Sequence, residues 1–261
     1  MESHVRTSLD QRLQSAQREH RLPSVVAGLC RDGELVWSGY AGTTLGEHAS
    51  APGDDVQYRI GSITKTFVAV LVMRLRDAGR LELTDPVGAY VPGTPVSEAR
   101  IGELLSHASG LQAETGGPWW ERTPGRDFET VLDSLDPGAR TRPGRRHHYS
   151  NVGYAVLGEL IARLHGEPWD QVLKETLLAP LGLRRTTPRP IEPHATGFAV
   201  HPFADVVLQE PEHDEGAMAP AGTLWSTVAD LSRWAVFLSG HTAGLLTEAT
   251  LAEMTEPLVV A

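Results

Sequence analysis

The sequence predicts an α/β (α+β) fold in which an antiparallel sheet flanked by helices is joined to an all-helical domain. Two β-type runs, residues 24–30 and 34–40, surround the turn-forming stretch Arg31-Asp32-Gly33, a pattern typical of a β-hairpin. Residues from about 81 to 207 carry short helical patterns between Pro- and Gly-rich loops, with no convincing strand run. A capping-box pattern at Thr227 opens a later helix, which we expect to return to the sheet.

The individual helices follow from hydrophobic periodicity and from helix-end signals. A polar, amphipathic pattern predicts an N-terminal helix over about residues 5–20. An apolar pattern predicts a second helix over about residues 62–78, which ends at Gly79, a residue type common at helix C-termini. Further helices are expected where apolar residues recur with helical spacing, at residues 152–164, 228–238 and 248–254.

Length and composition limit the classes of protein to consider. A chain of 261 residues with 41% hydrophobic residues suits one large globular domain or two small ones. We assign residues 1–80 and 216–261 to the α/β domain and residues 81–215 to the helical domain. A net charge of −10 argues against nucleic acid and anionic membranes as partners. The first 20 residues contain no apolar signal segment and no run reaches transmembrane length, so we expect a cytoplasmic protein.

Ser62 and Lys65 stand three residues apart at the start of an apolar helical run. Lys65 is one of two lysines in the chain, the other being Lys174, although arginine is abundant. Residues at this spacing share a helix face, and a helix N-terminus favours an anion forming on Ser62. Burial would lower the pKa of Lys65 and let its amine take the Ser62 proton, which an arginine cannot do. The alternative is an ordinary helix start with a serine N-cap and a solvated lysine.

Tyr149 and Asn151 form a second polar pair, which follows a Pro-Gly turn at the entrance of the helix predicted from Val152. Tyr149 is a candidate to move a proton between nucleophile and leaving group, and Asn151 is a candidate to bind a substrate amide. Taken singly, Tyr149 could be a half-buried aromatic and Asn151 a helix N-cap. The order of the motifs, S-x-x-K and then Y-x-N about eighty residues later, favours the chemical interpretation.

With these motifs the chain resembles the serine β-lactamase and penicillin-binding-protein superfamily, on the branch of class C β-lactamases, D,D-peptidases and related esterases. The resemblance covers most of the chain. It includes five further stretches: Tyr58-Arg59-Ile60-Gly61, Leu83-Thr84-Asp85-Pro86-Val87, Leu104-Leu105-Ser106-His107-Ala108-Ser109-Gly110-Leu111, Pro180-Leu181-Gly182-Leu183, and Pro220-Ala221-Gly222-Thr223-Leu224-Trp225-Ser226-Thr227.

The resemblance implies a role for each residue of the two motifs. Ser62 would be the acylated nucleophile, Lys65 its base, Tyr149 a second acid/base and Asn151 a substrate-binding residue. His107 also matches a family position, and there a structural role beneath the site is favoured over proton transfer.

The family's third motif, Lys/His-Thr/Ser/Gly-Gly on a strand that edges the active site, has no convincing match. We interpret His241-Thr242-Ala243-Gly244 as a loop, because it lies between two predicted helices and lacks the apolar β-branched residues of a core strand. The C-terminal strands of the sheet, and one oxyanion N–H, are therefore expected after residue 261. Three explanations are open: a sequence that is part of a longer protein, a second segment or chain that supplies the strands, or a degenerate member. The first two are favoured.

Other features bear on ligands. Trp119 and Trp120 are candidates to wall a substrate cleft, with capping of the helical core as the alternative. Five acidic residues between positions 205 and 215 suggest a cationic substrate group. No histidine pattern has a metal-ligand spacing, and no phosphate loop or dinucleotide fingerprint is present. We therefore expect neither a metal nor another cofactor.

These observations predict a serine hydrolase or acyltransferase that works through a Ser62 acyl-enzyme on a peptide-like amide, ester or thioester. One alternative is a stand-alone cyclising thioesterase of nonribosomal peptide biosynthesis, whose peptide substrate is bound to a carrier protein. An alternative of another class is a non-catalytic binding or scaffold protein. The absent third motif favours the scaffold, whereas the intact set of candidate catalytic residues argues against it.

Overall fold

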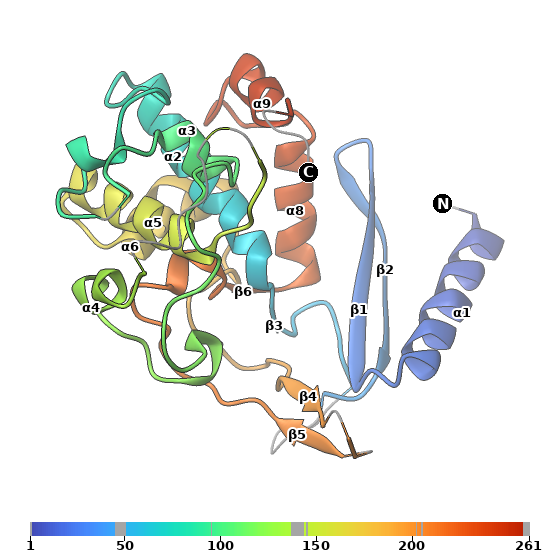
Figure 1. Cartoon of the computed structure of the whole chain (residues 1–261). Coiled ribbons are helices and arrows are strands. Elements are labelled where there is room, and N and C mark those ends of the chain that lie inside the picture. The colour runs from blue at the N-terminus through green and yellow to red at the C-terminus, as the bar shows by residue number, and fades with distance from the viewer. Residues whose placement is uncertain are drawn as a thin grey trace. The chain divides into compact units, whose positions relative to one another are not determined.

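The computed structural model describes residues 2–44, 51–94, 96–136, 144, 146–201, 203–204 and 206–257 (Figure 1). Its helices and small antiparallel sheets confirm the predicted α/β (α+β) class. The chain divides into two compact units: unit 1 is Met1–Ile60, Leu181–Pro211 and Leu224–Ala243, and unit 2 is Gly61–Pro180, Glu212–Thr223 and Gly244–Ala261. The sequence assignment grouped residues 61–80 and 244–261 with the α/β domain, and its domain boundaries stay a prediction.

Unit 1 contains the predicted hairpin. β1 (Ser24–Arg31) and β2 (Glu34–Gly42) pair antiparallel, with Ser24 opposite Gly42 at the open end. Asp32 and Gly33 form the turn, and both have positive φ values, of 51° and 82°. Asp and Gly adopt this conformation more readily than most residues, so the turn residues fix the pairing of the strands.

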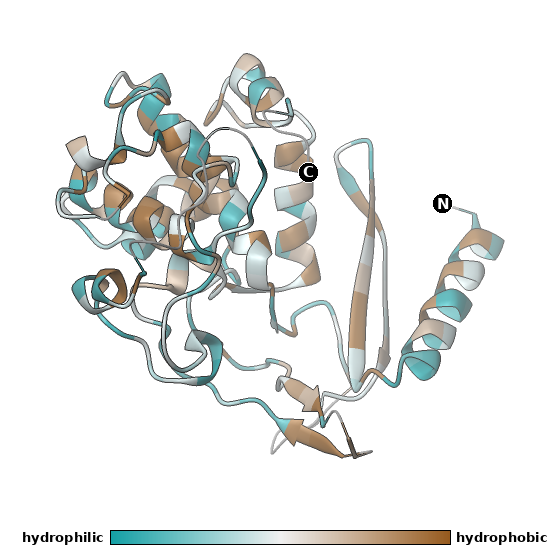
Figure 2. Cartoon of the chain, viewed as in Figure 1, coloured by the Kyte–Doolittle hydropathy of each residue, from teal (hydrophilic) through white to brown (hydrophobic). Residues whose placement is uncertain are grey.

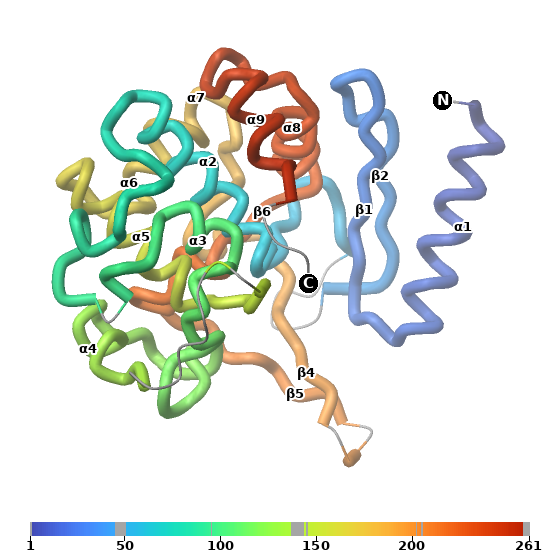
Figure 3. Tube along the Cα trace, turned by 45° about the horizontal axis from the view of Figure 1, so that its top comes forward, coloured from blue at the N-terminus to red at the C-terminus, as the bar shows by residue number. Residues whose placement is uncertain are grey.

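Two helices cover the hairpin of unit 1. α1 (Ser3–Glu19) contacts β2, and α8 (Val228–Leu238) contacts β1, so the hairpin lies between them (Figures 1 and 3). The buried indole of Trp37 in β2 donates to the Asp10 carboxylate of α1 at 3.0 Å. The predicted start of α8 is confirmed, because the Thr227 side chain accepts the N–H of the third helical residue.

Two further pairs of strands are very short. β3 (Tyr58–Arg59) pairs with β6 (Trp225–Ser226), and β4 (Phe198–Val200) pairs with β5 (Val207–Gln209). The prediction that residues 81–207 contain no strand is therefore wrong for β4 and for the start of β5. Three-residue strands are too short to show the period-two alternation by which strands are recognised in a sequence.

Unit 2 is centred on two helices that pack against each other, α2 (Thr64–Asp77) and α5 (Asn151–His165). Nine residues of each helix are buried. Helices with so broad an apolar surface are stable only inside a core. The hydrophobic residues of α2 and α5 are shown in brown in Figure 2. The predicted helix at 62–78 begins as a 3₁₀ turn, Gly61–Ile63, which continues directly into α2.

The remaining helical segments are short and are joined by loops, as predicted, except for one uninterrupted helical stretch over residues 169–181. The α-helices among them are α3 (Ile101–Leu105), α4 (Phe128–Asp133), α6 (Trp169–Leu173), α7 (Ala179–Leu181) and α9 (Glu248–Met254). The others are the 3₁₀ turns Val87–Ala89, Trp120–Arg122 and Ala219–Ala221 and the π-helical segment Lys174–Leu178. Of the helices in the described residues, none combines the length and the apolar character needed to cross a bilayer.

Gly158 of α5 supports a first prediction about stability. A Cβ at Gly158 would lie 2.1 Å from the ring of Pro220, whereas a Cβ at Gly153 of the same helix would find its nearest neighbour at 3.5 Å. Gly158→Ala should lower the free energy of unfolding by about 2 kcal/mol, because the overlap outweighs the helix-propensity gain of alanine. Gly153→Ala should be neutral or stabilise by up to about 1 kcal/mol. Urea unfolding of the two variants checks this, and equal effects would contradict it.

Candidate active site

Ser62 lies in the 3₁₀ turn that precedes α2, and two other side chains of unit 2 contact its hydroxyl oxygen. The Lys65 amine donates to Ser62 Oγ at 3.1 Å, and the Tyr149 hydroxyl donates to it at 2.7 Å. The i, i+3 spacing brings Lys65 to Ser62, and the entrance of α5 brings Tyr149. Lys65 and Tyr149, which the sequence proposes for proton transfer, thus both lie within direct hydrogen-bond distance of the Ser62 hydroxyl oxygen.

Lys65 is buried, with 5% of its surface exposed. Besides Ser62, its Nζ donates to Asn151 Oδ1 at 2.7 Å and to the backbone carbonyl of Ala221. It also lies 4.9 Å from the centre of the Tyr149 ring. Burial lowers the pKa of Lys65 from 10.5 to about 8, and nearby carboxylates partly oppose this shift. About half of the amine is therefore neutral near pH 8, as a general base requires.

Backbone contacts hold the segment that carries Tyr149 and Asn151. Ser150 is the N-cap of α5: its hydroxyl accepts the N–H of Gly153 at 3.0 Å and donates to the Gln112 carbonyl at 2.7 Å. The Asn151 N–H donates to the Ala113 carbonyl at 2.8 Å. The N-cap is thus Ser150, not Asn151, which leaves the Asn151 carboxamide available for Lys65.

His107 lies beneath Tyr149, with their ring centres 4.4 Å apart. Its Nδ1 accepts the backbone N–H of Ser150 at 3.1 Å. Burial, with smaller contributions from Lys65 and His147, lowers the pKa of His107 to about 4. A histidine that is neutral at pH 7 and bonded to the backbone fits the structural role favoured from the sequence, which stays a prediction.

Glu114 belongs to the same cluster, and the sequence interpretation missed it. Its Oε1 accepts from Asn151 Nδ2 at 2.7 Å, and its Oε2 accepts from the indole N–H of Trp120 at 2.8 Å. Because the carboxylate takes the Asn151 amide nitrogen, the amide oxygen turns toward Lys65. The one available sequence signal was an acidic residue in the loop after the Ser106–Leu111 stretch, and no spacing rule assigns a role to such a residue.

The two tryptophans have different environments. Trp120 is buried, with 5% of its surface exposed, and its indole N–H donates to the Glu114 carboxylate. Trp119 is 61% exposed, and its indole donates to the Glu121 carboxylate at 2.9 Å. The exposed Trp119 keeps the surface that contact with a substrate requires, whereas Trp120 fits the alternative of capping the helical core. Substrate binding by either residue stays a prediction.

The acidic residues near position 215 differ in exposure: Glu212 and Asp214 are exposed, and a preference for a cationic substrate group stays a prediction. Asp205 lies outside the described residues, the Glu215 carboxylate is buried and accepts from Thr223, and Asp214 accepts the N–H of Gly216 at 2.8 Å. The loop interpretation of His241-Thr242-Ala243-Gly244 is confirmed, since these residues connect α8 to α9. Among the described residues, no group of three His, Cys, Asp or Glu side chains could hold a metal ion.

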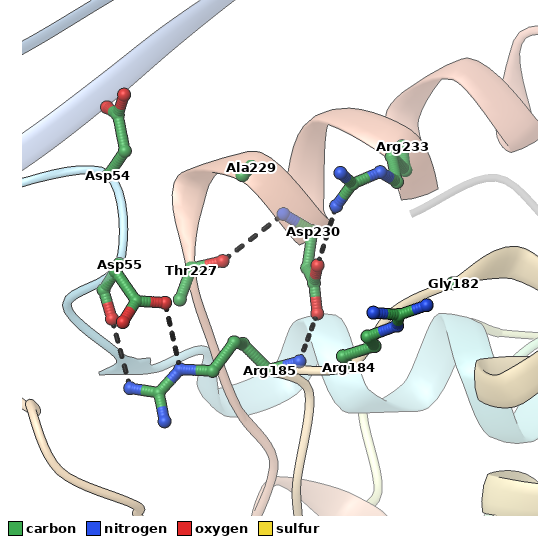
Figure 4. A pocket seen from close by; sticks show the side chains of 9 residues that line it. All are labelled: Asp54, Asp55, Gly182, Arg184, Arg185, Thr227, Ala229, Asp230 and Arg233. Carbon is green, nitrogen blue, oxygen red and sulfur yellow. Dashed lines mark hydrogen bonds and ion pairs between the residues drawn. The ribbon is translucent and has the colours of Figure 1, made fainter.

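A pocket of about 540 Å³ lies within unit 1, and its lining includes three arginines and three aspartates (Figure 4). Arg185 is paired with Asp55 at 3.1 Å, and Arg233 with Asp230 at 2.9 Å. Because the opposite charges balance, the pocket offers no clear preference for an anion or a cation, and we assign it no ligand.

A buried, partly neutral lysine beside a serine and a tyrosine is chemically suited to acyl transfer through the serine. Comparison with known proteins agrees with this class. The Beta-lactamase family model matches residues 9–261, and the chain belongs to that family. This confirms the resemblance seen in the sequence.

Individual relatives and solved structures show which members of the family the chain resembles. The chain is 31% identical to penicillin-binding protein 4 of Amycolatopsis lactamdurans over 192 residues, which cover 70% of this chain and 49% of that protein. A D-stereospecific amidohydrolase from Streptomyces sp. is 27% identical with a TM-score of 0.78, over 95% of this chain and 76% of the other. The octameric penicillin-binding protein homologue from Pyrococcus abyssi shares the fold, with a TM-score of 0.85 at 24% identity, over 98% of this chain and 61% of the other. The chain spans about half the length of the curated relatives it matches.

Proposed function

We propose that the protein is a serine hydrolase that cleaves amide bonds of small D-amino acid derivatives or peptides through an acyl-enzyme on Ser62. The main observation behind this proposal is the set of three hydrogen-bond acceptors around the Lys65 amine. The family membership and the similarity to a D-stereospecific amidohydrolase support the reaction class and the substrate class.

The hydrogen bonds of Lys65 indicate how it would act as a base. A neutral amine has two N–H groups and one lone pair. The Asn151 amide oxygen and the Ala221 carbonyl can only accept, so both N–H groups stay with them and the lone pair faces Ser62 Oγ. Ser62 is the one neighbour of the three that carries a proton to give. The surroundings of Lys65 therefore favour transfer of the Ser62 proton to its amine.

The rest of the cycle follows from the position of Tyr149. As Ser62 Oγ bonds to the substrate carbonyl carbon, its proton passes to Lys65. Collapse of the tetrahedral intermediate breaks the C–N bond, and the leaving amine takes a proton from the Tyr149 hydroxyl, which lies 2.7 Å from Ser62 Oγ. Proton exchange with Lys65 then restores Tyr149. Water finally releases the acid product and regenerates Ser62.

Intact-protein mass spectrometry tests the proposal directly. The protein is incubated with a penicillin or a fluorophosphonate, and the adduct is located by peptide mapping. A single adduct on Ser62, together with turnover of a D-amino acid anilide, is the expected result. An adduct elsewhere, or no adduct and no turnover, would contradict the proposal and favour the scaffold alternative.

The pH profile gives a separate prediction. Because the acylating form needs a neutral Lys65 with a pKa of about 8, kcat/KM for an N-acetylated substrate should rise about tenfold per pH unit below pH 8 and level off above it. Initial rates with an N-acetyl-D-amino acid anilide, which has no amine that titrates, give this profile between pH 6 and pH 9.5. A flat profile over the whole range would exclude a base that titrates near pH 8.

Finer aspects of the sequence interpretation stay hypotheses. In the cyclising thioesterase an amine of the same peptide would replace water, and product analysis with a peptidyl thioester distinguishes a ring from a linear acid. We favour hydrolysis because of the similarity to a D-stereospecific amidohydrolase. A carrier-protein partner, a second segment that completes the sheet and a cytoplasmic location are likewise predictions.

A further inference from the structure

We propose that Glu114 binds the protonated α-amino group of the substrate, so that the preferred substrates are amino acid amides and short peptides with a free N-terminal ammonium. This inference rests on the proposed function, because it places the substrate carbonyl at Ser62. The inference predicts that substrates with a free N-terminal ammonium are cleaved faster than N-acylated ones. Family membership alone does not predict this difference.

The first step is the position of the Glu114 carboxylate. Ser62 Oγ lies 3.1 Å from Lys65 Nζ, which lies 2.7 Å from the oxygen of the Asn151 carboxamide. The nitrogen of the same carboxamide lies 2.7 Å from Glu114 Oε1. One side-chain amide thus separates the carboxylate from the proposed base. In an amino acid amide the ammonium is bonded to the carbon next to the carbonyl, so the ammonium of a substrate whose carbonyl lies at Ser62 Oγ would lie in this neighbourhood.

The second step is the charge. Glu114 and Glu121 both interact electrostatically with Lys65 and oppose the lowering of its pKa. Their negative charge therefore contributes to the electrostatic potential at the proposed base. When Lys65 is neutral, as acylation requires, it no longer balances the charge of Glu114. Within the described residues, the hydrogen-bond partners of the Glu114 carboxylate are the Asn151 amide and the Trp120 indole, both neutral. A cationic substrate group would restore the balance.

The third step is the capacity and the rigidity of Glu114. A carboxylate offers about four lone-pair positions, and the two neutral donors occupy two of them. The side chain is exposed, so the remaining positions are accessible. The buried Trp120 and the α5 residue Asn151 fix its orientation before a substrate arrives. Such preorganisation reduces the entropic cost of binding an ammonium group.

The preference should be measurable with a matched pair of substrates. A charge-assisted hydrogen bond is worth more than a bond from a neutral amide N–H. We therefore expect kcat/KM for D-alanine p-nitroanilide to exceed that for its N-acetyl derivative by about 10- to 100-fold. Glu114→Gln keeps the size of the side chain and removes its charge, so this ratio should fall to near one.

Glu121→Gln is the matched control, because it removes a charge that acts on Lys65 without removing a partner of Asn151. Its substrate ratio should remain that of the wild type. Both variants should move the rising limb of the pH profile to lower pH, since each removes a carboxylate that raises the pKa of Lys65.

Three results would overturn the inference. Equal losses on both substrates in Glu114→Gln would mean that Glu114 acts only by orienting Asn151. A wild-type preference for the N-acetyl substrate, with a normal acyl-enzyme on Ser62, would refute ammonium recognition and leave the proposed function intact. No turnover of either substrate and no acylation of Ser62 would remove the proposed function and this inference together.

Discussion

Replacing Ser62 with alanine is expected to abolish the covalent adduct with penicillin or fluorophosphonate and to lower kcat/KM by at least about 10³-fold. The reason is that Ser62 Oγ is the atom on which both Lys65 and Tyr149 converge. Without it the base has no proton to accept and the carbonyl has no nucleophile. Intact-protein mass spectrometry measures the adduct, and initial rates with an anilide substrate measure the loss.

Ser239→Ala provides the control for this experiment. Ser239 is an exposed serine just after α8, and its hydroxyl donates to the Val236 carbonyl at 2.8 Å. Its replacement should leave both the adduct and the rate unchanged. If Ser62→Ala retained the adduct while Ser239→Ala lost it, labelling would reflect surface reactivity and the site would have to be sought elsewhere.

Replacing Lys65 with arginine should be about as damaging, with a loss of at least about 10³-fold in kcat/KM. The guanidinium stays protonated in proteins, so it cannot take the Ser62 proton, although it keeps the positive charge. The chain offers an unusual control, because its only other lysine, Lys174, is exposed in the π-helical segment Lys174–Leu178. Lys174→Arg makes the same chemical change and should alter the rate by less than about twofold.

Thermal unfolding of both lysine variants shows whether a loss of activity is chemical or structural. Lys65 is buried, so the larger guanidinium is expected to cost some stability, and circular dichroism at the assay temperature shows whether the fold persists. A folded Lys65→Arg protein with near wild-type activity would exclude Lys65 as the base and leave Tyr149 as the candidate.

Local sequence signals were sufficient to predict the residues at the centre of the candidate active site. Ser62 and Lys65 are close because three residues make about one helical turn, and Asn151 is recognisable because it stands at the entrance of a strongly apolar helix. Glu114 could not be predicted in this way. Its contact with Asn151 joins residues 37 positions apart and depends on how the loop before Trp120 folds. Long-range loop contacts leave no periodic pattern in a sequence.

The same difference between local signals and long-range contacts explains which elements of the fold could be predicted. The hairpin and the helices α2, α5 and α8 have long periodic patterns with clear turn or cap signals, and their positions agree with the sequence prediction within a few residues. β4 and β5 have three residues each, and only their pairing defines them. The burial of Glu215 and its hydrogen bond to Thr223 depend on tertiary packing, so the sequence did not show that this carboxylate is buried.

The contact between Pro220 and Gly158 reaches beyond stability. Ala221 follows Pro220 directly, and its carbonyl oxygen is one of the two acceptors that hold the N–H groups of Lys65. A side chain at position 158 would push the proline ring away and carry this carbonyl with it. The lysine lone pair would then no longer be confined to the direction of Ser62. Position 158 therefore affects the orientation of the Lys65 lone pair through Pro220 and Ala221, and a packing defect there would be observed as a loss of catalytic rate.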